Sequence, residues 1–137
     1  MKRVLARTLS YDSDKDLYYL DGEPFTGIAF TLAKDGSEKA QMEYLEGLRS
    51  GLTTEWYKPG QPMVESNYLR GVLHGSAREW HRNGKLAEEG TYEFGIAIVE
   101  KEWDENGQLT KDYKLQQWDE NYQRLLRLRA AYGPAGP

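Results

Sequence analysis

Residues 51–71 read GLTTEWYKPGQPMVESNYLRG, and residues 75–95 read GSAREWHRNGKLAEEGTYEFG. Both stretches have glycine at the first, tenth and last positions, tryptophan at the sixth and tyrosine at the eighteenth. They are therefore related by a step of 24 residues, and a step of 24 or 23 continues outward from them. The series in this register are Gly27, Gly51 and Gly75; Gly36, Gly60, Gly84 and Gly107; Tyr44, Tyr68 and Tyr92; Gly47, Gly71 and Gly95; and Trp56, Trp80 and Trp103. Several residue types in one register indicate a structural repeat.

Each repeat has the pattern of a β-hairpin. Segments of ordinary strand length lie between glycine-containing turns. At one of these turns the four units carry, in chain order, Asp35-Gly36, Pro59-Gly60, Asn83-Gly84 and Asn106-Gly107. Asp-Gly and Asn-Gly favour type I′ turns with positive φ at both residues, whereas Pro-Gly favours type II and predicts a longer or splayed connection. The turn after the second unit is expected over residues 70–75.

The repeats predict an all-β fold, a single elongated antiparallel meander of hairpins with a C-terminal capping helix. No single hairpin buries enough apolar surface to be stable, so neighbouring hairpins must stabilise one another. The tryptophans at equivalent positions are expected to form a ladder on one face of the sheet. The array should be less regular at its ends, because Leu32 replaces tryptophan in the first unit and Val99 replaces the closing glycine in the fourth.

The length of 137 residues predicts one domain, over residues 1–132. Residues 1–26 are expected to form an N-terminal cap, residues 27–114 four hairpin repeats, residues 115–132 a C-terminal helix and residues 133–137 a disordered tail. A degenerate hairpin with strands at 4–10, 17–20 and 25–32 is predicted at the N-terminus. Apolar side chains follow a helical period over residues 116–131. This helix is expected to cover the last hairpin and protect the sheet edge, and docking into a partner is the alternative.

The composition argues against several classes of protein. The chain has no cysteine for a disulfide or thiolate site, and its two histidines are too few for a multi-histidine metal centre. The 18 basic and 22 acidic residues give a net charge of −4, which disfavours a general nucleic-acid binder. No apolar run follows the basic N-terminus, and no stretch has the length of a membrane helix. We therefore expect a soluble, cytoplasmic protein.

Candidate catalytic and metal-binding motifs are weak. His74 and His81 have no third ligand at a fixed spacing, so turn-capping or solvent-facing roles are favoured. Residues 12–16 alternate aspartate with other residues, and Glu23 is twelfth from Asp12, as in a calcium loop, but Leu17 occupies the position that needs glycine. No serine has a nucleophile-elbow context, and the glycines recur at hairpin turns rather than in a phosphate loop. We expect a non-enzymatic protein with no metal and no cofactor.

Acidic residues are concentrated in the third and fourth hairpins. Residues 88–105 contain seven acidic residues and one basic residue, a net charge of −6, whereas residues 111–137 have a net charge of +2. Two interpretations are open, a surface complementary to a basic partner and a solubilising surface. Aromatic side chains are included as candidates because rigid aromatic anchors are typical of interfaces. The candidate partner-binding residues are Glu88, Glu89, Glu93, Glu102, Trp103, Asp104, Glu105, Tyr57 and Trp80.

The repeat resembles a known motif, the variant MORN repeat. The segments that carry this resemblance are EWHRNGKL at residues 79–86, WDENGQL at 103–109 and Leu73-His74-Gly75. The segment DGEPFTG at residues 21–27 is similar to the start of many bacterial proteins of this type. The resemblance covers residues 19–113 and implies an antitoxin or immunity protein that accompanies a secreted polymorphic toxin. The family is defined by structural glycines and aromatics, so the resemblance implies no catalytic residue.

Resemblance and charge together lead to one expected function. The protein is expected to bind and occlude a cognate secreted toxin domain, a basic one that acts on nucleic acid, in a one-to-one complex. It is expected to be monomeric when free and to bind neither nucleic acid nor membrane itself. The alternative is a MORN-type scaffold for protein or membrane docking, although a membrane reader should have a basic patch near apolar residues.

Overall fold

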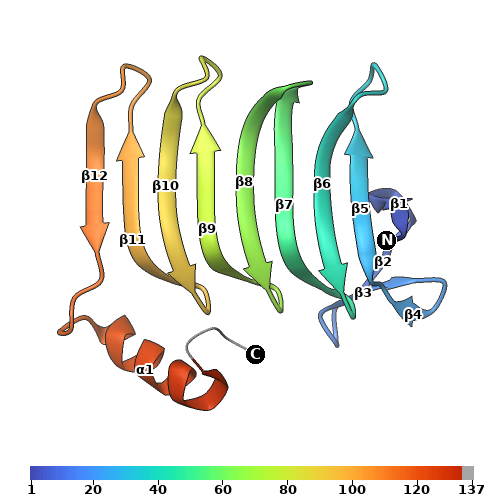
Figure 1. Ribbon diagram of the computed structural model, residues 1–137. Helices are drawn as coiled ribbons and strands as arrows, with labels where there is room; N and C mark the ends of the chain where they lie inside the picture. The colour runs from blue at the N-terminus through green and yellow to red at the C-terminus, as the bar shows by residue number, and fades with distance from the viewer. Residues whose placement is uncertain (134–137) are drawn as a thin grey trace.

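Nine strands form one curved sheet in the computed structural model, which describes residues 1–133 (Figure 1). In spatial order they are β1 (Arg3–Leu5), β5 (Gly27–Leu32), β6 (Glu38–Leu45), β7 (Leu48–Lys58), β8 (Gln61–Leu69), β9 (Val72–Trp80), β10 (Leu86–Glu93), β11 (Ile96–Trp103) and β12 (Leu109–Lys114). A second sheet contains β2 (Ser10–Asp12), β3 (Leu17–Leu20) and β4 (Glu23–Pro24). The remaining elements are the 3-10 helix η1 (Ala6–Thr8) and helix α1 (Glu120–Tyr132).

The predicted meander of hairpins is confirmed. Every neighbouring pair of strands from β5 to β12 is antiparallel and consecutive in the chain, so these strands form four hairpins. The strand register repeats with the sequence, since each repeat tyrosine lies opposite a repeat glycine. These cross-strand partners are Gly27 and Tyr44, Gly51 and Tyr68, and Gly75 and Tyr92.

The turns between hairpins have the φ signs of type I′ turns. Glu46-Gly47, Arg70-Gly71 and Phe94-Gly95 have φ values of 50° and 85°, 50° and 85°, and 53° and 80°. Each is a two-residue connection, because the flanking strand residues are direct partners. The turn expected over residues 70–75 is therefore limited to residues 70 and 71, and the remainder belongs to β9.

The prediction of type I′ turns at Asp-Gly and Asn-Gly is wrong. The glycines there have positive φ, but among the described residues Asp35, Asn83 and Asn106 do not. Asp35 and Asn83 instead accept hydrogen bonds through Oδ1 from the backbone N–H two residues later, each at 2.9 Å. Such an Asx bond stabilises a turn without a left-handed Asx residue. At Pro59-Gly60 only Gly60 has positive φ, as in the predicted type II turn, but the predicted longer connection is wrong, because Lys58 and Gln61 are direct partners.

Hydrogen bonds between hairpins recur at both ends of the strands. At one end, the N–H groups of Gly47, Gly71 and Gly95 donate to carbonyl oxygens 22 residues earlier, each at 2.8 Å. At the other end, the Tyr57 hydroxyl donates to the Trp80 carbonyl oxygen at 2.7 Å, and His81 Nε2 contacts that of Trp103 at 2.8 Å. The repeated residues thus include those that join one hairpin to the next.

The predicted strand at residues 17–20 is confirmed as β3, but the N-terminal residues do not form one degenerate hairpin as predicted. Strand β1 pairs in parallel with β5, and β2 to β4 form the separate small sheet. A hydrophobic core lies where this small sheet meets the first hairpin, and the rings of Tyr18 and Tyr44 pack there with centroids 5.3 Å apart. Its buried members are Phe25, Ala29, Met42 and Tyr44, with Val4, Ala6, Leu9, Tyr18 and Leu20 packed against them. The core therefore occupies one end of the meander.

Helix α1 lies below the strand ends rather than over edge strand β12, contrary to the prediction (Figure 1). Arg129 Nε donates to Glu93 Oε1 at 2.9 Å, the Tyr132 ring lies 5.9 Å from that of Phe94, and Leu125 is buried. The helix therefore packs at the end of β10. These contacts leave β12 as the last strand of the sheet.

The helix also begins at Glu120, five residues later than the predicted start at residue 115. The preceding residues form a turn in which Asp119 Oδ2 accepts a hydrogen bond from the Gln116 N–H at 2.8 Å. Of the predicted disordered tail, residues 134–137 lie outside the described residues. Within residues 1–133, no helix has the length and apolar character needed to cross a membrane.

Candidate protein-binding face

One face of the sheet carries a row of glutamates. Directly opposite residues of an antiparallel pair point to the same face, and such partners can be followed from strand to strand. Residues from six neighbouring strands, β7 to β12, make up this row: Glu55, Val64, Glu79, Glu88, Glu102 and Lys111. Four of the six are glutamates and one is basic. We call these four glutamates, together with Glu100 in the adjacent row, the acidic face.

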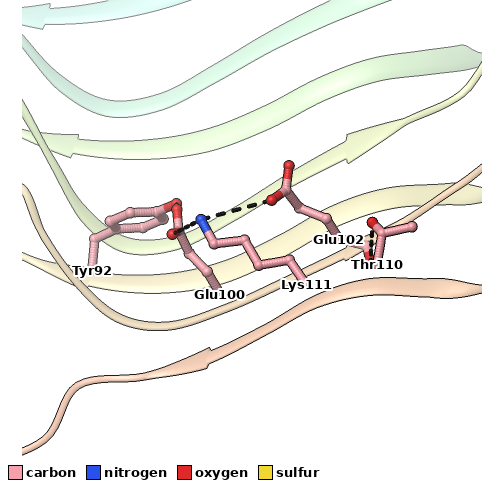
Figure 2. Close-up of polar contacts among 5 residues, drawn as sticks. All are labelled: Tyr92, Glu100, Glu102, Thr110 and Lys111. Atoms are coloured by element: carbon pink, nitrogen blue, oxygen red, sulfur yellow. Dashed lines mark hydrogen bonds and ion pairs between the residues drawn. The ribbon is translucent and has the colours of Figure 1, made fainter.

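Glu100 is held by a small polar network (Figure 2). The Tyr92 hydroxyl donates to Glu100 Oε2 at 2.6 Å, and Lys111 Nζ lies 2.9 Å from Glu100 Oε1 and 3.7 Å from Glu102 Oε2. The hydrogen bond from Tyr92 is the main cause that lowers the pKa of Glu100; burial opposes it and Lys111 adds to it. The lysine thus neutralises part of the acidic face at its β12 end.

Gly90 makes room for this network. Gly90 is buried in β10, opposite Glu100, and a Cβ atom at this position would lie 2.9 Å from Cε1 and 3.1 Å from the hydroxyl oxygen of Tyr92. A side chain here would therefore displace the tyrosine ring that donates to Glu100.

A groove of about 210 Å³ opens on the acidic face. Its lining residues include Glu55, Glu79, Glu88, Tyr68 and Tyr92, together with the basic Arg78. Burial is the main cause that raises the pKa of Glu88, and the charges of Glu79 and Glu102 raise it further. A cation placed in this groove would stabilise the charged form of Glu88.

The structure places only part of the predicted set on the acidic face. Glu88 and Glu102 are on it, as cross-strand partners. Glu89 lies on the opposite face of β10, where Arg78 Nε donates to its Oε2 at 2.8 Å. Neighbouring residues of one strand alternate between faces, so a charged stretch of sequence is divided between them.

The predicted tryptophans lie away from the acidic face, and Tyr57 is engaged in other contacts. Trp80 and Trp103 each follow a glutamate of the row directly, so they are on the opposite face, and both are half-buried. The predicted tryptophan ladder is not observed, since ring pairs within residues 1–133 join tyrosine, phenylalanine and histidine. Tyr57 is occupied by its bond to the Trp80 carbonyl and by the Arg82 guanidinium, 4.7 Å from the ring centroid.

The other three predicted acids have structural contacts. Glu93 binds Arg129 of α1, and this hydrogen bond is the main cause that lowers the pKa of Glu93. Asp104 Oδ1 accepts hydrogen bonds from two backbone N–H groups of its own turn, each at 2.9 Å. Glu105 is exposed in that turn, and its carbonyl oxygen accepts a hydrogen bond from Asn83 Nδ2 at 2.9 Å.

Three residues of the acidic face were not predicted: Glu55, Glu79 and Glu100. A signal for the first two was present, since Glu55, Glu79 and Glu102 follow the 24- and 23-residue steps and each directly precedes a repeat tryptophan. Because residues one repeat apart occupy equivalent positions, these three carboxylates belong to one row. Glu100 had no such signal, because its place depends on its contact with Tyr92.

The weak metal motifs make ordinary turn and strand contacts. His74 Nδ1 accepts a hydrogen bond from the Phe94 N–H at 2.9 Å. Asp12 Oδ1 accepts hydrogen bonds from the N–H groups of Asp14 and Lys15, at 2.9 and 3.2 Å, which closes the turn between β2 and β3. Within the described part of the chain, no group of three or more His, Asp or Glu side chains is placed to hold a metal ion.

Comparisons with known proteins support the repeat. The family model of the MORN repeat variant matches residues 73–93, which span β9 and β10. No curated protein matches the chain. Two solved structures are similar to this chain, each with 14% sequence identity. The crystal structure of TarM has a TM-score of 0.37, and the match covers 65% of this chain and 18% of that chain. The crystal structure of the GtfA/B complex bound to UDP and GlcNAc has a TM-score of 0.34, and the match covers 82% of this chain and 28% of that chain. The chain spans less than a third of either, and at these TM-scores the likeness does not bear on function.

Proposed function

We propose that this protein is a non-enzymatic binding protein that holds a basic protein partner on its acidic face. The observation that carries the proposal is the row in which Glu79, Glu88 and Glu102 occupy three adjacent strands. Like charges directly opposite each other destabilise a sheet, and solubility alone does not require that they be aligned. Lysine or arginine side chains of a partner would relieve this repulsion, and the field of the row would steer the approach of that partner.

The partner we propose is a secreted toxin domain, bound one to one. The resemblance to bacterial antitoxin and immunity proteins supports this class. A toxin domain that acts on nucleic acid needs a basic cleft to bind the phosphate backbone. A curved acidic sheet inserted over that cleft would block access to the substrate. The alternative, docking on an anionic membrane, is not favoured for this face because its charge has the same sign as the lipid.

The test uses the C-terminal domain of the secreted protein encoded directly upstream, as this proposal requires. The acidic-face variant is Glu79→Gln, Glu88→Gln and Glu102→Gln together. The matched control changes the net charge equally with Glu65→Gln, Glu89→Gln and Glu105→Gln. Two of the control positions lie on the opposite face and one in an exposed turn.

The acidic-face variant should associate about ten-fold or more slowly at low salt, because steering depends on the removed charges, whereas the control should change the rate less than about two-fold. The rates are measured by stopped-flow fluorescence, and cells that express the toxin domain report protection. Equal association rates and equal protection for both variants would contradict the proposal.

A further inference from the structure

Within residues 1–133, no strand pairs with the outer side of β12. This strand ends the nine-stranded sheet, and α1 lies below the strands rather than beside β12 (Figure 1). Five of its six residues are exposed. Trp118, close after the strand, is 82% exposed, and Leu109 at the start of the strand is 50% exposed. An edge with unpaired backbone groups beside exposed apolar side chains is a template for another strand.

The hydrogen bonds to β11 identify which backbone groups of β12 point outward. The Leu115 N–H donates to the Ile98 carbonyl oxygen, and in this register Tyr113 lies opposite Glu100. Bonded and non-bonded pairs alternate along an antiparallel ladder. The backbone groups of Leu115 and Tyr113 therefore face β11, whereas those of Asp112 and Lys114 face away from the sheet.

We propose that β12 pairs in an antiparallel manner with β12 of a second copy of this chain, with Asp112 opposite Lys114. Around a two-fold axis, outward-facing backbone groups of one copy must meet those of the other. If the two-fold axis lies at or between residues 112 and 114, three registers are possible. They place Asp112 opposite Asp112, Lys114 opposite Lys114, or Asp112 opposite Lys114. The first two place like charges opposite each other, whereas the third forms an attractive pair twice. Charge complementarity therefore selects both the register and a second copy as the occupant.

The other side chains of the segment agree with this register. In this register the two-fold axis passes between the two Tyr113 residues, so their rings meet on the side of the acidic face. In each chain, Lys111 Nζ lies 6.0 Å from the centroid of the Tyr113 ring. Trp118 and Leu109 lie beyond opposite ends of the pairing, so an antiparallel arrangement brings Trp118 of one copy toward Leu109 of the other. This removes the two most exposed apolar side chains of the edge from water.

The pairing does not depend on the proposed function, and it departs from the sequence-based expectation of a free monomer. Sedimentation velocity on the purified full chain, from about 1 to 500 µM, should show a monomer–dimer equilibrium. Asp112→Lys or Lys114→Asp alone places like charges at both pairs and should raise the dimer dissociation constant about ten-fold or more. The double variant Asp112→Lys with Lys114→Asp should restore the dimer.

Mixing the two single variants tests the register itself. In the mixed dimer, the position changed by Asp112→Lys in one copy lies opposite the position changed by Lys114→Asp in the other, and the native Lys114 and Asp112 form the second pair. Both pairs then have opposite charges. The mixture should therefore form a heterodimer, although each variant alone forms a weakened homodimer. Asp112→Pro removes an outward N–H but no bond to β11, so it should abolish the dimer and keep the wild-type circular dichroism spectrum. A wild type that stays monomeric throughout, single variants that dimerise like the wild type, or a mixture that does not associate would each overturn the proposal.

Discussion

Replacing Glu88 with glutamine is expected to stabilise the protein at pH 7. Glu88 has Glu79 and Glu102 as its cross-strand partners, one on each side. Directly opposed like charges cost roughly 0.2–1 kcal/mol per pair, so removal of both repulsions should contribute about 1 kcal/mol. For a domain of this size, that free energy corresponds to a rise in Tm of about 3–5 °C. Thermal unfolding followed by circular dichroism measures it.

The advantage of glutamine should depend on pH. Burial and the neighbouring carboxylates raise the pKa of Glu88 above its ordinary value of 4.5, so the folded state binds this proton more tightly than the unfolded state. The contribution of the wild-type group to stability is therefore fully present below pH 4.5 and is lost as the pH rises through the raised pKa. Glutamine has no such loss. The difference in Tm between variant and wild type should be small near pH 4 and largest near pH 7.

Glu89→Gln is the matched control, because it makes the same change one residue further along β10 on the opposite face. It removes an ion pair with Arg78, which is exposed and contributes about 0–1 kcal/mol, so its Tm should stay the same or fall. A Glu88→Gln protein that melts below the wild type at pH 7, or whose advantage is the same at pH 4 and pH 7, would refute repulsion along the row. The proposed function would then lose its supporting observation.

Two further variants test the turns and the helix. Gly84 has φ of +86° with open space around it, so Gly84→Val should cost about 1–2 kcal/mol through the backbone alone, while Thr91→Val at an exposed strand position should leave Tm nearly unchanged. Equal Tm values for the Gly84→Val and Thr91→Val variants would mean that the turn is not at Gly84. Arg129→Gln should destabilise by under about 1 kcal/mol at pH 7, since its partner Glu93 is only partly buried. Because Arg129 lowers the pKa of Glu93, this contribution is lost as the pH falls through that pKa, so chemical denaturation near pH 3 should no longer separate the variant from the wild type.

The sequence predicted the hairpins because the same residues that set its period also set the strand register and the bonds between hairpins. It did not predict the turn types. Glu46 and Phe94 adopt φ near 50°, although neither residue type favours it, and each donates its N–H to a side chain 20 residues earlier, Thr26 Oγ1 and His74 Nδ1. The following glycines bond to the previous hairpin as well. These long-range bonds override the local preference on which the prediction relied.

The candidate site was predicted only in part, because charge was counted along the chain. A stretch such as residues 88–105 covers both faces of two strands, so it combined Glu88 and Glu102 with Glu89 and with turn residues. Counting by repeat phase would instead have grouped Glu55, Glu79 and Glu102. The position of the helix was unpredictable for a different reason, since its apolar stripe fits any exposed apolar surface, and only the contact with β10 decides between them.

The acidic face continues the same side of the sheet that forms the hydrophobic core at the other end. In the row adjacent to the glutamates, cross-strand partners change from Ala29 and Met42, which are buried in the core, through the buried Thr53 and Ser66, to Glu100. Every hairpin supplies the same backbone, so side chains alone convert a covered end into an open charged one. The opposite face carries charges of both signs, such as the pair of Arg78 and Glu89, which suits a surface that is merely soluble. The excess of negative charge on the acidic face, which Lys111 only partly neutralises, supports the proposed recognition of a basic partner.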